Sequence, residues 1–93
     1  MQTIKLFAAS SKDMSPEEAS LLVNKYVILL FPDRDMFRSF GTLCKIREII
    51  QESNVNQILL TNIHGTKCGP IRSGEQWQVI DSLSDLDLLY QLG

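Results

Sequence analysis

The stretch Tyr26-Val27-Ile28-Leu29-Leu30-Phe31 decides the fold, because six consecutive apolar side chains leave no polar face for water. Lys25 precedes the stretch and Pro32 ends it. As a strand, it would lie inside a sheet that is covered on both faces, as parallel strands usually are. As the end of a helix, it would be apolar on every side, and a domain this small could bury it only against a partner chain.

The residue types in and before this stretch favour the strand. Asn24 suits the left-handed conformation that follows many helices, so a preceding helix can end there. Tyr, Val, Ile and Phe prefer a pleated surface, and six residues is an ordinary strand length. The helical alternative stays open, because Tyr26 and Leu30 continue the apolar stripe of the segment before them.

Two helices are predicted around this stretch. Ser15 is a good N-cap, Pro16 suits the first helical position, and Glu18 completes a capping box. A second helix is predicted from Asp33 or Asp35 to residues 53–54. Its apolar face would carry Met36, Phe40, Leu43 and Ile50, with Phe37, Cys44, Ile46 and Ile49 beside them.

The remaining segments are mostly strands. Residues 2–8 alternate in polarity, residues 57–63 have an apolar centre, residues 71–72 form a possible short strand, and residues 77–80 form the last one. A final helix is predicted to carry Leu86, Leu89 and Tyr90. The order β-α-β-α-β-β-α predicts one α/β domain over residues 1–93, a mixed sheet of four to five strands flanked by helices and parallel in its first half. An α+β fold is the alternative.

Composition narrows the function classes. The chain has 93 residues, 44% of them hydrophobic, and two cysteines, Cys44 and Cys68, which we expect to be reduced thiols in a cytoplasmic protein. No signal-peptide pattern and no apolar run long enough for a membrane span is visible. All nine Lys and Arg lie in residues 1–72, and the formal net charge is −2, which argues against a nucleic-acid partner. No cofactor is expected.

The best candidate site would form where parallel strands end, because ligands collect beyond those carboxyl ends. Three loops would meet there, spanning residues 10–13, 32–35 and 62–67. The candidate binding residues are Ser10, Ser11, Lys12, Asp13, Asp33, Arg34, Asp35, His64 and Lys67.

Each motif in these loops has two interpretations. Asp33 and Asp35 are spaced to hold Mg²⁺, but Asp is also a common helix cap. His64 lies four residues before Cys68, which suits a base that activates a thiol, but a glycine-rich turn fixes neither group. Arg34, Arg38 and Lys45 would form a basic helix face without an exposed aromatic stack, which favours a solvated surface over a phosphate backbone.

No constellation meets the geometric needs of catalysis, so the chain is not expected to be an enzyme. The leading hypothesis is a small regulatory or inhibitory protein that acts by protein–protein association, either with another protein or with itself as a homodimer. The alternative is a domain that binds a metal or phosphate ligand through the Asp33/Asp35 loop, in nucleic-acid processing.

Overall fold

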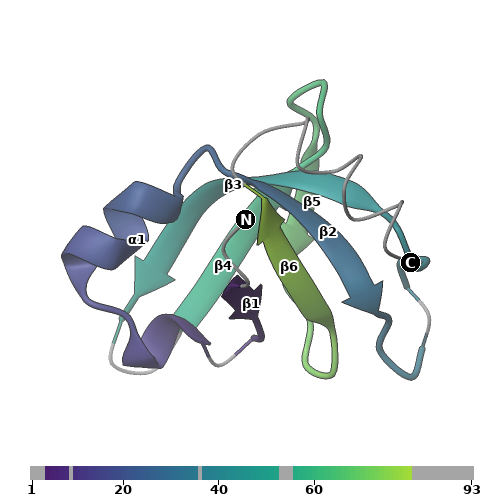
Figure 1. Ribbon diagram of the computed structural model, residues 1–93, viewed down its shortest axis with the longest axis horizontal. Coiled ribbons are helices and arrows are strands. Elements are labelled where there is room, and N and C mark those ends of the chain that lie inside the picture. The colour runs from purple at the N-terminus through teal and green to yellow at the C-terminus, as the bar shows by residue number, and fades with distance from the viewer. Residues whose placement is uncertain (1–3, 9, 36, 53–55, 81–93) are drawn as a thin grey trace.

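Six antiparallel strands form one sheet in the order β1-β6-β2-β3-β4-β5 (Figure 1). The computed structural model describes residues 4–8, 10–35, 37–52 and 56–80. Its elements are β1 (Ile4–Leu6), the 3-10 helix η1 (Ser10–Asp13), α1 (Pro16–Leu22), β2 (Tyr26–Phe31), β3 (Leu43–Gln51), β4 (Asn56–Thr61), β5 (Lys67–Pro70) and β6 (Gln76–Ile80).

The predicted α/β class is therefore wrong. The sheet is antiparallel throughout its described pairings, and α1 is the one α-helix in the part of the chain that the structure describes. The connections explain this arrangement: β3 to β4, β4 to β5 and β5 to β6 are each joined by five residues or fewer. A parallel pair needs a crossover of a dozen residues or more, which these connections cannot provide.

The strand prediction for Tyr26–Phe31 is confirmed, with both faces of β2 buried. Val27 and Leu29 point into the main core, whereas Ile28 is buried on the opposite face of the sheet. β2 pairs with β3 on one side and β6 on the other, so its Val27 lies between Cys44 and Val79. The apolar run is thus explained by a central antiparallel strand rather than by a parallel one.

The predicted second helix is wrong. Residues 43–51 form the longest described strand, and the segment before them is an irregular connection. Cys44 and Ile46 point into the core while Lys45 between them does not, which is the two-residue period of a strand. The three isoleucines of β3 also prefer a pleated surface. This segment carries apolar residues at helical spacing, but it also has the two-residue period and the β-branched residues of a strand, and a strand is what it forms.

The first helix is confirmed at its start. The Ser15 hydroxyl accepts the Glu18 N–H at 3.1 Å, and Pro16 is the first helical residue. The helix ends at Leu22, and Asn24 takes the left-handed conformation, with φ 75°. The strand predicted over residues 71–72 is displaced to Lys67–Pro70. The predicted final helix lies outside the described residues.

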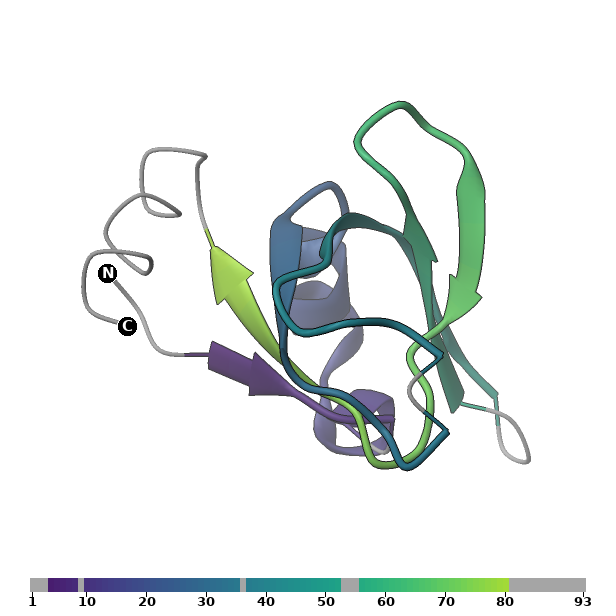
Figure 2. The same ribbon diagram turned by 90° about the vertical axis from the view of Figure 1, so that its right-hand side faces the viewer.

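The core lies on one face of a twisted and curved sheet (Figure 2). Every strand from β1 to β4 and β6 contributes to it, and Ile71 joins from just beyond β5. Trp77 is its largest fully buried side chain. Ala19 of α1 is buried, and Leu22 packs against this core. None of the helices in the described ranges is long and apolar enough to cross a membrane.

Candidate functional site

The long connection between β2 and β3, residues 32–42, is shaped by a glycine bulge. The Gly41 N–H donates to Leu29 O at 2.8 Å, and the Leu29 N–H donates to Thr42 O at 2.9 Å. Two residues thus oppose one, and the first is a glycine with φ 84°, which is the pattern of a G1 β-bulge. The bulge returns the chain to β3 and places the preceding residues outside the sheet. It also explains why a glycine stands at position 41.

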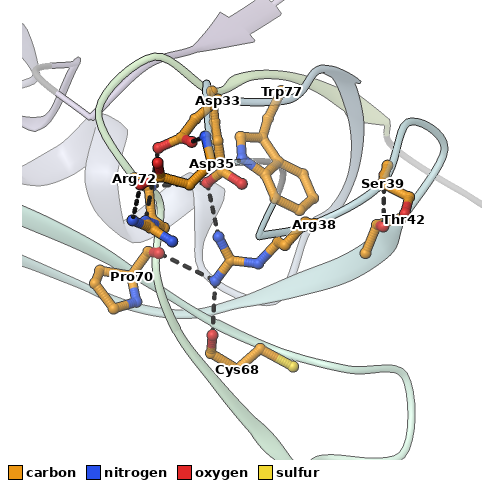
Figure 3. Close-up of polar contacts among 10 residues, drawn as sticks. Asp33, Asp35, Arg38, Ser39, Thr42, Cys68, Pro70, Arg72 and Trp77 are labelled. Carbon is orange, nitrogen blue, oxygen red and sulfur yellow. Dashed lines mark hydrogen bonds and ion pairs between the residues drawn. The ribbon is translucent and has the colours of Figure 1, made fainter.

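Arg38 anchors this connection to the body of the protein (Figure 3). Its side chain is only 6% exposed, and its Nη1 lies 2.7 Å from Glu75 Oε1, which is fully buried. Its Nη2 donates to Cys68 O at 2.6 Å and to Pro70 O at 3.1 Å. The guanidinium also lies over the Trp77 ring, 5.6 Å from its centroid. These contacts tie the connection to β5 and to the residues before and within β6.

The two carbonyls bound by Arg38 belong to β5, an edge strand of the sheet. Because the Ile71 N–H donates to Ile58 O in β4, alternation along the strand turns Cys68 and Pro70 away from β4. Arg38 therefore occupies the outward carbonyls, and Pro70 has no N–H to offer. Exposed edges pair readily with other strands, and these two features block that pairing at β5.

One carboxylate oxygen of Glu75 accepts three hydrogen bonds. Its Oε1 accepts Arg38 Nη1, the Arg72 N–H at 2.8 Å and Trp77 Nε1 at 3.4 Å. The other oxygen, Oε2, is buried and has no hydrogen-bond partner among the described atoms. The carboxylate thus joins the β2–β3 connection, the turn after β5 and the core tryptophan. Removing Arg38 would leave this charge buried with backbone and indole donors alone.

A second, more exposed ion-pair group fixes the start of the connection. Arg72 lies 3.6 Å from Asp33 Oδ2 and 3.1 Å from Asp35 Oδ2. Asp33 Oδ1 also accepts the Asp35 N–H at 2.6 Å, which closes a tight turn. These carboxylates therefore have a guanidinium and a backbone amide as partners. Within the described residues, no group of three or more His, Cys, Asp or Glu side chains is placed to hold a metal ion.

The phenylalanine side chains of the chain lie at the surface. The chain has four phenylalanines. All four are exposed: Phe7 by 47%, Phe31 by 58%, Phe37 by 63% and Phe40 by 67%. Phe37 lies against the guanidinium groups of Arg38 and Arg72, with centroid distances of 5.1 and 4.9 Å. We call Phe31, Phe37 and Phe40, within ten consecutive residues, the aromatic surface.

The three loops of the predicted site do not meet. η1, which carries Ser10, Ser11, Lys12 and Asp13, is held at the far end of β3, where Gln51 Nε2 donates to Ser11 O at 2.7 Å. His64 lies in the turn after Thr61 and Lys67 is the first residue after it, at the other end of the β3–β4 hairpin. Asp33 and Asp35 lie beside Arg72, and Arg34 lies between them in the chain. The parallel strand ends on which the predicted site depended are absent from the described sheet. The binding role of these residues stays a prediction.

His64 and Cys68 are separated by their turn. The His64 N–H donates to Asn62 Oδ1 at 2.9 Å, and Cys68 Sγ donates to Thr66 O at 3.4 Å. Neither contact joins the imidazole to the thiol.

Sequence reasoning missed the exposed aromatics because it placed Phe37 and Phe40 on a buried helix face. A signal was available, since Pro32, Asp33, Asp35, Ser39 and Gly41 all favour turns and loops. Their density within ten residues argues against a helix. The burial of Arg38 and Glu75 had no local signal, because the two residues are 37 positions apart.

Comparison with known proteins finds no matching family model, no similar curated protein and no similar solved structure.

Proposed function

We propose that this protein acts by protein–protein association, with the aromatic surface as its docking site and a second copy of the chain as the partner. The observation that carries the proposal is the contrast in exposure between Trp77, which is fully buried, and Phe31, Phe37 and Phe40, which are all more than half exposed. Aromatic side chains are enriched at the energetic centres of protein interfaces.

The size of the patch supports an interface. Each of the three phenylalanines presents on the order of 100 Å² of apolar surface, so together they present roughly 300 Å². Apolar surface on this scale marks an interaction site when it is contiguous. The rigid backing matters too, because the buried Arg38–Glu75 pair holds the loop before any partner arrives. A preorganised surface loses less conformational entropy on binding than a flexible one.

Charge supports a second copy as the occupant. Arg34 and Asp35 are neighbours with opposite charge, both exposed in the connection that also carries Phe37 and Phe40. In a two-fold interface, each patch meets its own copy in reverse, so a patch that carries both signs can complement itself. A uniformly charged patch would repel its copy.

Sedimentation equilibrium over a wide concentration range tests the proposal. We expect the wild-type chain to dimerise at micromolar to high micromolar concentrations. The double variant Phe37→Ala/Phe40→Ala should dimerise at least about tenfold more weakly, because each buried aromatic contributes ~1 kcal/mol or more to binding. Both side chains are exposed in the monomer, so its fold should be unaffected.

Phe7→Ala is the matched control, because Phe7 is also exposed but lies after β1, outside the aromatic surface. This variant should dimerise like the wild type. A wild-type chain that stays monomeric at high micromolar concentration would overturn the proposal. So would an equal weakening by Phe7→Ala.

A further inference from the structure

A polar pocket of about 350 Å³ lies near the opposite end of β3 from Gln51, and the proposed function does not use it. It lies between the first half of β3 and the turn that follows β4. Its lining residues are Asn24, Lys45, Ile46, Arg47, Thr61, Asn62, Ile63, His64 and Gly65. Two of them are basic residues, Lys45 and Arg47, one is the only histidine of the chain, and none is an acid.

Both basic lining residues belong to β3. A β-bulge shifts the register of β3 between Ile46 and Glu48, so Arg47 is the extra residue of the strand. Bulges change the direction of a side chain relative to regular pairing. Lys45 pairs with Thr61 across the hairpin, and its ammonium group lies 5.7 Å from the centroid of the Tyr26 ring. Both basic residues are thus held on a hydrogen-bonded strand, Lys45 in regular pairing and Arg47 at the bulge, rather than on a loop.

The turn supplies a neutral donor. Asn62 Oδ1 accepts two backbone N–H groups, from His64 at 2.9 Å and from Thr66 at 3.0 Å. These bonds fix the amide with its oxygen toward the turn. Its Nδ2 group is therefore the end that a ligand in the pocket can reach. An amide nitrogen donates hydrogen bonds but accepts none, so this end also suits an anion.

One carboxylate lies next to the pocket without lining it. Glu48 Oε1 is 3.2 Å from Arg47 Nη2, and the two side chains are 50% and 38% exposed. Such exposed pairs contribute at most about 1 kcal/mol, so a multiply charged ligand can compete for the arginine. Arginine can also bind phosphoryl oxygens in a bidentate manner, whereas its contact with Glu48 joins one nitrogen to one oxygen.

We infer that this pocket binds a phosphoryl group, as free phosphate or as the phosphate of a small phosphorylated molecule. Lys45 and Arg47 provide the charge, Asn62 provides an oriented neutral donor, and the His64 imidazole provides a further N–H. The volume accommodates one phosphoryl group with part of an attached molecule. This inference does not depend on the proposed dimerisation, because no residue of the aromatic surface lines the pocket.

A titration followed by ¹H–¹⁵N NMR tests the inference. Inorganic phosphate and a nucleoside monophosphate are added separately, at constant ionic strength maintained with chloride. We expect saturable shifts centred on residues 45–47 and 61–65. Tighter binding of the nucleoside monophosphate identifies a phosphate ester as the ligand, whereas equal or tighter binding of inorganic phosphate identifies the free ion.

Two variants and a control make the test specific. Lys45→Gln and Arg47→Gln keep most of the side-chain length but remove the charge, and each should weaken binding by about tenfold, as expected for a lost charge-assisted hydrogen bond. Lys67→Gln removes the same charge from the same hairpin region outside the lining, and should bind like the wild type. Shifts that do not saturate would overturn the inference, as would equal weakening by Lys67→Gln.

Discussion

The Cys44 thiol shows how one residue can report on the interior of the sheet. Cys44 lies in the core on β3 and is 2% exposed, which confirms the burial expected from the sequence although it occurs in a strand. Burial raises the pKa of the Cys44 thiol from 9.0 to about 12. The neighbouring Cys68 thiol raises this pKa further, whereas the positive charge of Arg38 lowers it. The thiol is therefore protonated and unreactive at neutral pH.

This pKa shift predicts a loss of stability at alkaline pH. Above about pH 9 the unfolded chain has lost the thiol proton while the folded chain keeps it, so the free energy of unfolding falls as pH rises toward 12. The slope from this group should approach about 1.4 kcal/mol per pH unit. Below pH 8 the group should contribute no slope. Urea unfolding between pH 7 and 10.5 measures this effect.

Cys44→Ala is the matched variant for the alkaline measurement. It should be less stable at neutral pH because it leaves a small cavity, but its stability should fall less steeply above pH 9. Other groups that titrate in this range affect both proteins alike, so the difference between the two slopes isolates Cys44. Equal slopes would contradict the prediction.

At the scale of elements, the limits of α1 could be predicted from local sequence, whereas the structure of β3 and of the connection before it could not. Ser15, Pro16 and Asn24 act through backbone groups a few residues away, so their positions predicted the limits of α1 correctly. The segment from Asp33 to Asn54 carries apolar residues at both helical and strand spacing. Its outcome depends on pairing with β2 and β4, which no short window of sequence contains.

The buried Arg38–Glu75 ion pair should contribute strongly to stability, because it joins the β2–β3 connection to the turn after β5 and to Trp77 in β6. Arg38→Met should lower the free energy of unfolding by about 3–5 kcal/mol, since it leaves the Glu75 carboxylate buried without its cation. It also exposes the two outward carbonyls of β5. The double variant Arg38→Met/Glu75→Leu should recover much of this loss, because an apolar pair needs no charge partner. Urea denaturation of the wild type and both variants measures these differences.

Arg72→Ala is the control for the buried pair. It removes the ion pairs with Asp35 and Asp33 and the contact with Phe37, all made by an arginine side chain that is 36% exposed, and ion pairs at such exposed positions contribute little. Its cost should stay near 1 kcal/mol or below. If Arg38→Met costs no more than Arg72→Ala, the buried pair does not anchor the loop, and the rigid backing of the aromatic surface must be abandoned.

At the scale of the whole molecule, long-range pairing determines the fold. β6 pairs with both β1 and β2, although more than 40 residues separate it from either strand. The positions of β1, β2, β4 and β6 were predictable, because alternation, apolar runs and turn residues are local, whereas β3 was predicted as a helix and β5 as a turn. Strand order was not predictable, because the helix wrongly predicted up to residues 53–54 supplied the crossover that a parallel pair requires. The same limit applies to the site: the parallel strand ends that would have gathered its three loops do not form.

The order β1-β6-β2-β3-β4-β5 predicts a gradient of local stability across the sheet. Val27 lies in a strand that is paired on both sides and buried on both faces, so its amide should be among the slowest to exchange with solvent. Lys5 lies in a three-residue edge strand paired only with β6, so its amide should exchange faster by at least about a hundredfold, equivalent to ~3 kcal/mol. Native-state hydrogen exchange read by NMR compares the two directly. The amides of β5 provide an internal test, because Arg38 bonds its outward carbonyls and should slow its exchange relative to β1. Exchange of β2 as fast as that of β1 would contradict the central position of Tyr26–Phe31, on which the topology depends.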